Sequence, residues 1–393
     1  MGEHKTKRDV VVYFGMGFLP DNNAVACREQ AIRAITEDAG YTSVLIGISK
    51  SVPFGKFEKI IENGVLCYNI KYAASLKEKL NDTYVVSKTL VSVLEDVGVD
   101  KIKCFIMQDY QLRPMKQMKS YCQAHGIAYV ADIMDWFTPT KDYSLPKNIF
   151  KSADTFLRMH LFYPFLKNKI YISHTFEHYF QDDSQKNIFV LPCTCKDVEY
   201  PIDCDDHASE SITITFAGFP GKKFEKEKLD WIIQALYENH SGIELNIIGL
   251  DKESFLEKAP SLEECVTETT HFWGYLPRTQ CLEILARSDF SIVARKVNKL
   301  TQYGFSSKIC EAFAHGIPVI ATNNSDHQVY IKNGINGYVC DANYESLKEL
   351  MKRIELTDRA SIQEMRRHLT QDNPLSVKKY VEGFRRFMEN TIV

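Results

Sequence analysis

The sequence predicts an α/β protein with two doubly wound domains, and three observations support this prediction. Short β-rich runs alternate with longer helical runs, which is typical of mostly parallel sheets covered by helices on both faces. The alternation occurs twice, on either side of a polar, acidic segment at 196–211. The 393 residues exceed what one hydrophobic core usually supports. We expect one domain at 1–197, a second at 211–373, and a last helix at 374–393 that crosses back to the first domain.

The first predicted domain begins with a βαβ unit. A strand and glycine-containing turn at 9–17 precede an amphipathic helix at 22–40, and the next strand is 42–49. The alternation continues with strands at 103–108, 127–133, 169–174 and 187–193 and with helices at 115–126 and 175–181.

The second predicted domain repeats this order. Ligands of such sheets bind at the carboxyl ends of the strands, so we expect a site in a cleft between the domains. Its predicted strands are 211–221, 244–250, 271–276, 289–296 and 317–323, and its predicted helices are 228–239, 280–288, 306–316 and 346–355. A last helix, predicted at 372–390, either caps this domain or crosses back to the first.

Composition and charge exclude several classes of protein. The net charge is -3, with 48 Lys and Arg against 51 Asp and Glu, so nucleic acid is not an expected partner. The N-terminus lacks the apolar stretch of a signal peptide, and no segment reaches the roughly 18 apolar residues that span a bilayer. We therefore expect a cytoplasmic protein whose membrane contact, where there is any, is peripheral, at the inner face and through the first domain.

Cysteine spacing and acidic motifs give no metal site. The eleven cysteines are scattered, and the closest pair, Cys193 and Cys195, suits neither zinc nor a disulfide framework, so free thiols are expected. The run DCDD at 203–206 has the form of a metal-binding Asp-x-Asp motif, but it lies in the expected linker. No metal and no cofactor are predicted.

A glycine turn with lysines at 216–229 is the first candidate anion site. Gly218 and Gly221 expose backbone amides after a strand, and Lys222 and Lys223 place ammonium groups where a phosphate would sit. The alternative is an ordinary solvated loop.

The helix after Gly304 is the second candidate. Ser306 or Ser307 suits the N-cap, and the positive end of the helix dipole favours an anion, which Lys308 would also face. Glu311 lies at i+3 from Lys308 and could accept both hydroxyls of a ribose. The alternative is a solvated ion pair between Lys308 and Glu311.

Two further strand ends supply polar residues to the same edge of the sheet. Arg295 follows a buried run and is expected to project into the cleft, and Asn324 and Ser325 follow the next strand, where they contact a ligand or shape a turn. The two Asn-Gly turns within 332–339 are expected to be structural.

The first domain offers a second group of candidates. The loop around Gly17 lacks a complete Gly-x-Gly-x-x-Gly pattern, so it suits contact with an acceptor substrate better than a dinucleotide. Asp132, Asp135 and Trp136 end a strand, where a carboxylate beside an aromatic ring suits a sugar or a general base. The alternative for these residues is a helix cap with a core tryptophan. His160 and His174 are further candidates, and the alternative for each is a structural histidine; His160 is assigned to the acceptor side.

Four segments together resemble the retaining GT-B glycosyltransferases of family 4, also called group 1. They are AGFPGKK, HFWGYLPRTQCLEILARSDFSIVAR, GFSSKICEAFAHGIPVIAT and YIKNGINGYV, within residues 211–340. The first domain resembles the family more loosely, through DIMDWF, ISHTFEHYF and VLPC. The Lys308 and Glu311 motif with the preceding Arg295 looks most like enzymes of bacterial surface-polysaccharide biosynthesis. The resemblance implies a GT-B fold, with two Rossmann-like domains facing across a cleft.

The resemblance also assigns roles to residues. It implies that Gly221, Lys222 and Lys223 hold the diphosphate of the donor. It further implies that Lys308 reinforces that site and that Glu311 binds the ribose.

One position departs from the family pattern. Tyr303 stands where the family often has a glutamate at the donor sugar, eight residues before Glu311. Arg295 and Lys308 are therefore expected to carry more of the charge stabilisation.

The resemblance implies a metal-independent, retaining transfer of a sugar from a nucleotide-sugar, UDP-linked, to a glycan or lipid-linked glycan. In such enzymes the leaving phosphate takes the acceptor's proton, so no protein base is obligatory. Two alternatives are a UDP-sugar epimerase on the same fold and a non-catalytic, nucleotide-sugar-binding assembly subunit.

Overall fold

The computed structural model divides into two compact units. The first comprises Met1–Cys195 and Val377–Val393, and the second Lys196–Ser376. Each unit is described by itself. The structure describes residues 9–19, 24–62, 65–71, 73, 76–139, 143–197, 211–221 and 224–392.

The strands of the first unit form one sheet. They are β1 (Val10–Phe14), β2 (Thr42–Ser49), β3 (Phe57–Glu62), β4 (Val65–Lys71), β5 (Ile102–Gln108), β6 (Ala128–Ile133), β7 (Asn168–Tyr171) and β8 (Asn187–Val190). Their order is β3-β4-β2-β1-β5-β6-β7-β8, and every neighbouring pair is parallel except β3 and β4. The apolar residues of β1 are all buried, as expected of a central strand covered on both faces.

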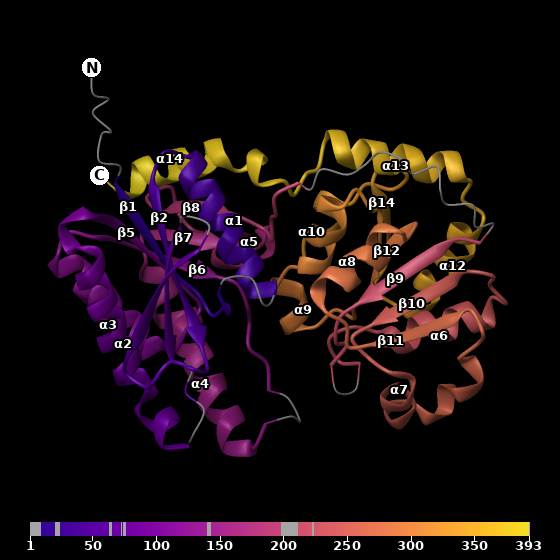
Figure 1. Cartoon of the computed structure of the whole chain (residues 1–393), viewed down its shortest axis with the longest axis horizontal. Coiled ribbons are helices and arrows are strands. Elements are labelled where there is room, and N and C mark those ends of the chain that lie inside the picture. The colour runs from indigo at the N-terminus through magenta and orange to yellow at the C-terminus, as the bar shows by residue number, and fades with distance from the viewer. Residues whose placement is uncertain are drawn as a thin grey trace. The chain divides into compact units, whose positions relative to one another are not determined.

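Helices cover both faces of this sheet. One face carries α1 and the C-terminal α14, whose Phe384, Phe387 and Met388 join the core under β1 and β5 (Figure 1). The Asn187 amide of β8 donates to the Phe387 carbonyl at 2.9 Å, which fastens α14 to the sheet edge. The helices are α1 (Ala24–Asp38), α2 (Leu76–Val97), α3 (Leu112–Ala124), α4 (Leu145–Leu161), α5 (His174–Phe180) and α14 (Val381–Thr391), with short 3-10 turns at Val99–Lys101, Tyr163–Phe165 and Val377–Lys379.

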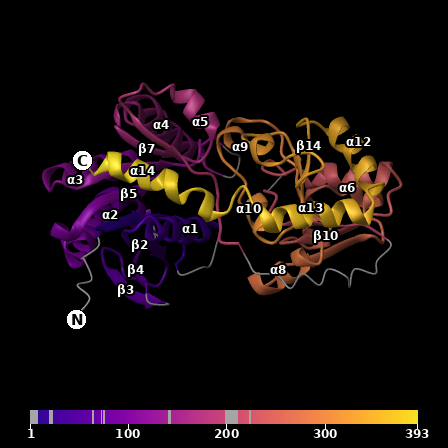
Figure 2. The same cartoon turned by 90° about the horizontal axis from the view of Figure 1, so that it is seen from above.

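The second unit is a parallel sheet in the order β11-β10-β9-β12-β13-β14. Its core lies between β9, β10 and β12 and the helices α6 and α12. Helix α13 packs along α10 (Figure 2). The strands are β9 (Thr213–Ala217), β10 (Glu244–Ile248), β11 (Thr270–Gly274), β12 (Phe290–Val293), β13 (Val319–Thr322) and β14 (Gly337–Cys340). The helices are α6 (Leu229–Glu238), α7 (Lys252–Lys258), η4 (Pro260–Cys265), α8 (Arg278–Ala286), α9 (Lys299–Tyr303), α10 (Ser307–Ala314), α11 (His327–Tyr330), α12 (Tyr344–Glu355) and α13 (Arg359–Gln371).

The helix predicted at 372–390 begins later than expected, at Val381, because the chain turns at Asn373. The Asn373 side chain accepts from the Leu375 amide at 2.9 Å and donates to Asp197 at 2.9 Å. This turn ends α13 before it, and α14 begins only at Val381. The sequence prediction also missed β3, β4, β14, α2, α4, α7, α9, α11 and α13.

Two other expectations can be compared with the described residues. None of the cysteines in the described part of the chain forms a disulfide, and half of them are buried. Among those same residues, no helix is both long and apolar enough to cross a bilayer.

Candidate active site

The turn after β9 and the start of α10 meet in the second unit. Gly218 and Gly221 have φ of 115° and 93°, which a residue with a side chain rarely adopts. A Cβ on Gly218 would lie 2.8 Å from Cε of Lys308, so the glycine gives the lysine room to lie against the turn. The sequence prediction that these two segments share one site is consistent with this geometry. Lys222 and Lys223, and the DCDD run, lie outside the described residues.

A buried carboxylate, Glu227, organises this site. Its backbone N–H donates to the Pro220 carbonyl at 3.2 Å, which folds the glycine loop back on itself. Its side chain, 1% exposed, accepts from Arg295 Nη2 at 2.9 Å and from the Lys308 ammonium. Burial alone raises the pKa of Glu227, but Lys308 and Arg295 outweigh it and lower the pKa to about 2. The carboxylate is therefore ionised and shared by two cations.

Sequence reasoning missed Glu227. It lies in the run FEKEK, where alternating charges are typical of a solvated surface, and nothing marks this acid as buried. One signal could have found it: Glu227 lies just before α6 and a few residues after the glycine turn, so its carboxylate can reach the ends of the neighbouring strands.

Lys308 is the more accessible of the two cations. Its side chain is 17% exposed, and its ammonium lies 4.6 Å from the centre of the Phe216 ring. Burial lowers its pKa, and the charge of Glu227 opposes that shift. The expected alternative, an ion pair between Lys308 and Glu311, does not form, because Glu311 accepts from Arg278 Nη1 at 2.7 Å instead.

Arg295 does not project into open space, which corrects the sequence expectation. It is 6% exposed, and its guanidinium donates to Glu227 and, at 3.1 Å, to the Ser306 hydroxyl. Its positive charge therefore acts on the site through buried contacts with Glu227 and Ser306, not by direct exposure to a ligand. Ser306 occupies the N-cap position of α10, as expected, but its hydroxyl accepts from Arg295 rather than from the helix amides. Ser307, the first helical residue, is half-buried.

The strand end after β13 is folded tightly. The Asn324 amide donates to the Lys296 carbonyl at 3.2 Å and the Thr301 hydroxyl at 3.0 Å, so it ties β13 to α9. Asn324 Oδ1 and Ser325 Oγ are buried polar atoms without a partner in the described residues, and Ser325 has a positive φ of 51°. Tyr303 ends α9 half-buried, and burial raises the pKa of its phenol.

Asp132 in the first unit is enclosed, which corrects the expectation that it lies open to an acceptor. It is fully buried at the end of β6, and it accepts from Arg28 at 2.7 Å and from the Tyr13 hydroxyl at 2.7 Å. The Arg28 guanidinium also donates to the carbonyls of Leu191 and Pro192, both at 3.0 Å. This pair ties α1 to strands β1, β6 and the end of β8.

Gly17 is shaped by a second buried acid. Its amide donates to Glu29 Oε1 at 2.6 Å, and a Cβ on Gly17 would lie 2.8 Å from the backbone of Ala26. Burial raises the pKa of Glu29 to about 8, and its Oε2 has no partner in the described residues. Glu29 was not a sequence candidate.

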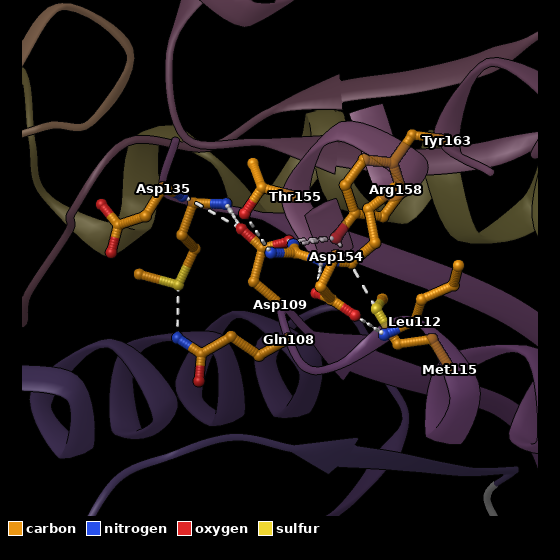
Figure 3. Close-up of polar contacts among 10 residues, drawn as sticks. Gln108, Asp109, Leu112, Met115, Asp135, Asp154, Thr155, Arg158 and Tyr163 are labelled. Atoms are coloured by element: carbon orange, nitrogen blue, oxygen red, sulfur yellow. Dashed lines mark hydrogen bonds and ion pairs between the residues drawn. The ribbon is translucent and has the colours of Figure 1, made fainter. Parts of the chain in front are cut away.

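Asp135 is exposed beyond the end of β6, unlike Asp132. Its backbone N–H donates to Asp109 Oδ2 at 3.0 Å, while its carboxylate points away from the buried Asp109, Asp154 and Arg158 (Figure 3). Arg158 Nη1 donates to Asp109 at 3.0 Å, and burial raises the pKa of Asp109 despite this. Of these carboxylates, Asp135 is the one open to solvent.

The aromatic candidates lie together next to it. Trp136 packs edge-on against His160, with ring centres 6.4 Å apart, and against Tyr179 at 5.0 Å. His160 is exposed, whereas Trp136 is 9% exposed. His174 lies apart in α5 and pairs with Glu177 at 2.9 Å.

The described residues hold no group of three or more His, Cys, Asp or Glu side chains placed to bind a metal ion. That the reaction needs no metal stays a prediction.

Comparison with protein families matches residues 214–374 to the family described as "Glycosyl transferases group 1". The match covers the glycine turn, Glu227, Arg295, α10 and the β13 strand end. A search of curated protein sequences found no match.

Solved structures resemble the whole chain. Sucrose-phosphate synthase from Thermosynechococcus elongatus has a TM-score of 0.67 at 14% identity, covering 97% of this chain and 98% of that one. A glycosyltransferase from Rickettsia africae has a TM-score of 0.63 at 13% identity, with 98% of each chain covered. HepE from Anabaena, solved with UDP-glucose, has a TM-score of 0.62 at 11% identity, covering 97% and 99%.

The fold and the coarse activity follow from these observations. The two α/β units have the GT-B fold. The second unit carries a group 1 glycosyltransferase domain, and the chain is a glycosyltransferase.

Proposed function

We propose that the chain transfers a sugar from a UDP-sugar to a glycan or lipid-linked glycan with retention of the anomeric configuration. The observation that carries the proposal is the surplus of positive charge where the glycine turn meets α10. Arg295 and Lys308 share the single carboxylate of Glu227. The N–H groups at the start of α10 add the positive end of the helix dipole, and Ser306 does not cap them with its side chain.

This charge suits the chemistry of glycosyl transfer. When the bond between the anomeric carbon and the diphosphate breaks, negative charge develops on the leaving group. Lys308 and the amides of the turn at Gly218 and Gly221 are proposed to stabilise it, with Lys222 and Lys223 reaching the same diphosphate. Arg295 is proposed to hold Glu227, and thereby Lys308, in place.

Glu311 is proposed to bind the ribose hydroxyls and Tyr303 to face the donor sugar. Glu311 is partly exposed, so its carboxylate is accessible while it pairs with Arg278. The solved structure of HepE with UDP-glucose supports a UDP-linked donor. Asn324 and Ser325 are proposed to contribute the unpartnered Oδ1 and Oγ to the donor.

The acceptor is proposed to meet the first unit at Asp135, Trp136 and His160, with the Gly17 loop nearby. Asp135 offers an exposed carboxylate beside aromatic rings, which suits a sugar hydroxyl. In a retaining reaction the leaving phosphate takes the acceptor's proton. The proposal includes no metal and no cofactor, and it keeps the cytoplasmic location expected from the sequence.

The experiment incubates the purified chain with a panel of UDP-sugars, with and without glycan and lipid-linked acceptors. We expect release of UDP from one donor, faster with the right acceptor, and a product whose anomeric configuration by NMR equals that of the donor. Unchanged rates with EDTA are expected. Binding of UDP without hydrolysis or transfer of any donor would instead favour an assembly subunit, and conversion of one UDP-sugar into another would favour an epimerase.

A further inference from the structure

Helix α4 of the first unit has its polar and apolar sides largely reversed. A surface helix normally buries its apolar residues and exposes its charged ones. In α4 the buried residues are Thr155, Arg158 and Met159, and Asp154 is nearly buried. Seven large apolar side chains of α4 and the following turn are exposed, and we call them the α4 face: Leu145, Ile149, Phe150, Phe156, Leu157, Leu161 and Phe165.

The buried side of α4 is fixed by ion pairs. Arg158 donates to Asp109 at 3.0 Å, to Asp154 at 2.8 Å and to the Tyr163 hydroxyl at 2.9 Å (Figure 3). Rolling the helix to bury Phe150 and Phe156 would break these buried contacts and leave charges unpaired, which is strongly destabilising. The fold of this unit therefore keeps the α4 face outward.

The exposed charges on α4, the following turn and the neighbouring α3 have one sign. From 143 to 167 the sole acid is Asp154, which is turned inward, and the neighbouring α3 has no acid from 112 to 124. Lys116 and Lys119 of α3 line a hollow of about 250 Å³ together with Leu161 and Phe165. The other basic residues on these two segments, apart from the buried Arg158 and the exposed His160, are Arg113, Lys147, Lys151 and Lys167.

Aromatic rings border the α4 face at both ends. The Lys147 ammonium lies 3.6 Å from the centre of the Tyr143 ring, an arrangement of apolar body and charged tip that suits the boundary between water and lipid. At the other end, Phe156 packs on His160 at 4.5 Å, and His160 packs on Trp136. The α4 face is thus continuous with the residues assigned to the acceptor under the proposed function.

We propose that the α4 face binds a bilayer surface that carries anionic headgroups, with α4 lying in the plane of the interface. Exposed apolar side chains enter the headgroup boundary, and the flanking lysines meet the anionic lipids. We favour a bilayer over a second protein as the partner because the basic residues that flank the α4 face complement anionic lipid headgroups. The proposal does not depend on the donor chemistry, so vesicle binding and UDP-sugar turnover can fail separately.

The test is co-sedimentation of the full chain with vesicles of phosphatidylcholine alone or of equal parts phosphatidylcholine and phosphatidylglycerol. We expect binding to the mixed vesicles, weakened by salt, and little binding to the neutral ones. The double variant Ile149→Ser/Phe150→Ser should lose about tenfold in affinity or more, because two apolar side chains leave the interface. Lys147→Gln should lose about fivefold at low salt.

Matched controls distinguish binding by the α4 face from nonspecific binding by exposed apolar or basic residues elsewhere. Leu356→Ser removes an apolar residue that is 85% exposed in the other unit, and Lys352→Gln removes an exposed lysine there; neither should alter vesicle binding. Thermal unfolding of every variant should match the parent, because the altered side chains are exposed. Equal binding by parent and α4 variants, or no vesicle binding together with a dimer that Ile149→Ser/Phe150→Ser dissociates, would overturn the proposal.

Discussion

Each unit of the protein contains a buried carboxylate that pairs with basic side chains, but the two are neutralised differently. In the first unit, Asp132 meets one guanidinium, that of Arg28, and both are enclosed. In the second unit, Glu227 is shared by Arg295 and Lys308, and Lys308 is partly exposed. The first arrangement is balanced, and the second has one positive charge to spare.

The difference teaches how to interpret polar residues at strand ends. In parallel sheets such residues have access to a ligand site by position alone. Whether they bind a ligand depends on their net charge and their exposure. A buried ion pair of one acid and one base has no net charge and no exposed group with which to bind a ligand. By that criterion the first cluster supports the fold and the second supports anion binding.

The largest expected effect comes from breaking the balanced pair. Asp132→Asn leaves the buried guanidinium of Arg28 without its counter-ion, which should lower the free energy of unfolding by about 3–5 kcal/mol in urea denaturation. UDP binding, measured on the fraction that remains folded, should not change. A loss below about 1 kcal/mol would mean that Asp132 is not the main partner of Arg28.

Glu29 extends the comparison to a buried carboxylate that forms no ion pair with any cation in the described part of the chain. Burial raises its pKa to about 8, whereas an unfolded glutamate titrates near its usual value of about 4.3. Between these values the folded state holds a proton that the unfolded state has released, so stability should fall as the pH rises from about 4.5 to 8.

Glu29→Gln should remove this pH dependence while its oxygen still accepts from the Gly17 amide. Above about pH 8 the parent must bury an ionised carboxylate when it folds, whereas the glutamine variant does not. The pKa difference between about 4.3 and about 8 corresponds to about 5 kcal/mol, because each tenfold change in proton affinity is worth about 1.4 kcal/mol. The buried NH₂ group of the glutamine, which has no acceptor at the position of Oε2, offsets about 1–3 kcal/mol of this gain. The variant should therefore be more stable than the parent by about 2–4 kcal/mol in urea denaturation at that pH. Parallel pH profiles for parent and variant would show that Glu29 ionises normally.

The charge surplus in the second unit predicts a smaller effect, and on binding rather than folding. Lys308→Ala should weaken UDP binding by about 1–3 kcal/mol in calorimetry, the scale of a hydrogen bond to a charged group. Lys352→Ala, at an exposed lysine of the same unit, is the matched control and should leave affinity unchanged. Equal affinities for parent and Lys308→Ala would remove Lys308 from the diphosphate site.

The sequence was sufficient to predict the order and position of strands whose apolar runs are short and clearly bounded. Strand β2 lies at Thr42–Ser49, as predicted, because a glycine precedes it and polar residues follow. Helix α4 was not predicted, although its apolar and polar residues fall on separate sides, and periodicity alone does not tell that the apolar side is the exposed one.

The site was predictable as a set of segments but not as a set of partners. Spacing along α10 correctly put Lys308 and Glu311 on one helix, yet each pairs with a residue distant in sequence, Glu227 and Arg278. Long charged side chains choose partners that the tertiary fold brings close, and local spacing contains no information about these. The same reason explains why Arg295 was predicted to project into the cleft, whereas it is buried against Glu227.

The smallest expected effect tests the partner of Glu311. Glu311→Gln keeps the side chain's shape but removes the charge that accepts from Arg278, and this partly exposed pair should contribute only about 0.2–1 kcal/mol to stability. If the carboxylate accepts both ribose hydroxyls, UDP affinity should fall by about 1 kcal/mol, roughly fivefold. A 2′,3′-dideoxy analogue of UDP lacks these hydroxyls, so its affinity should be the same for the parent and for Glu311→Gln. An equal loss for both ligands would instead assign the effect to Arg278, released from its partner and reoriented near the diphosphate, and the ribose role would be withdrawn.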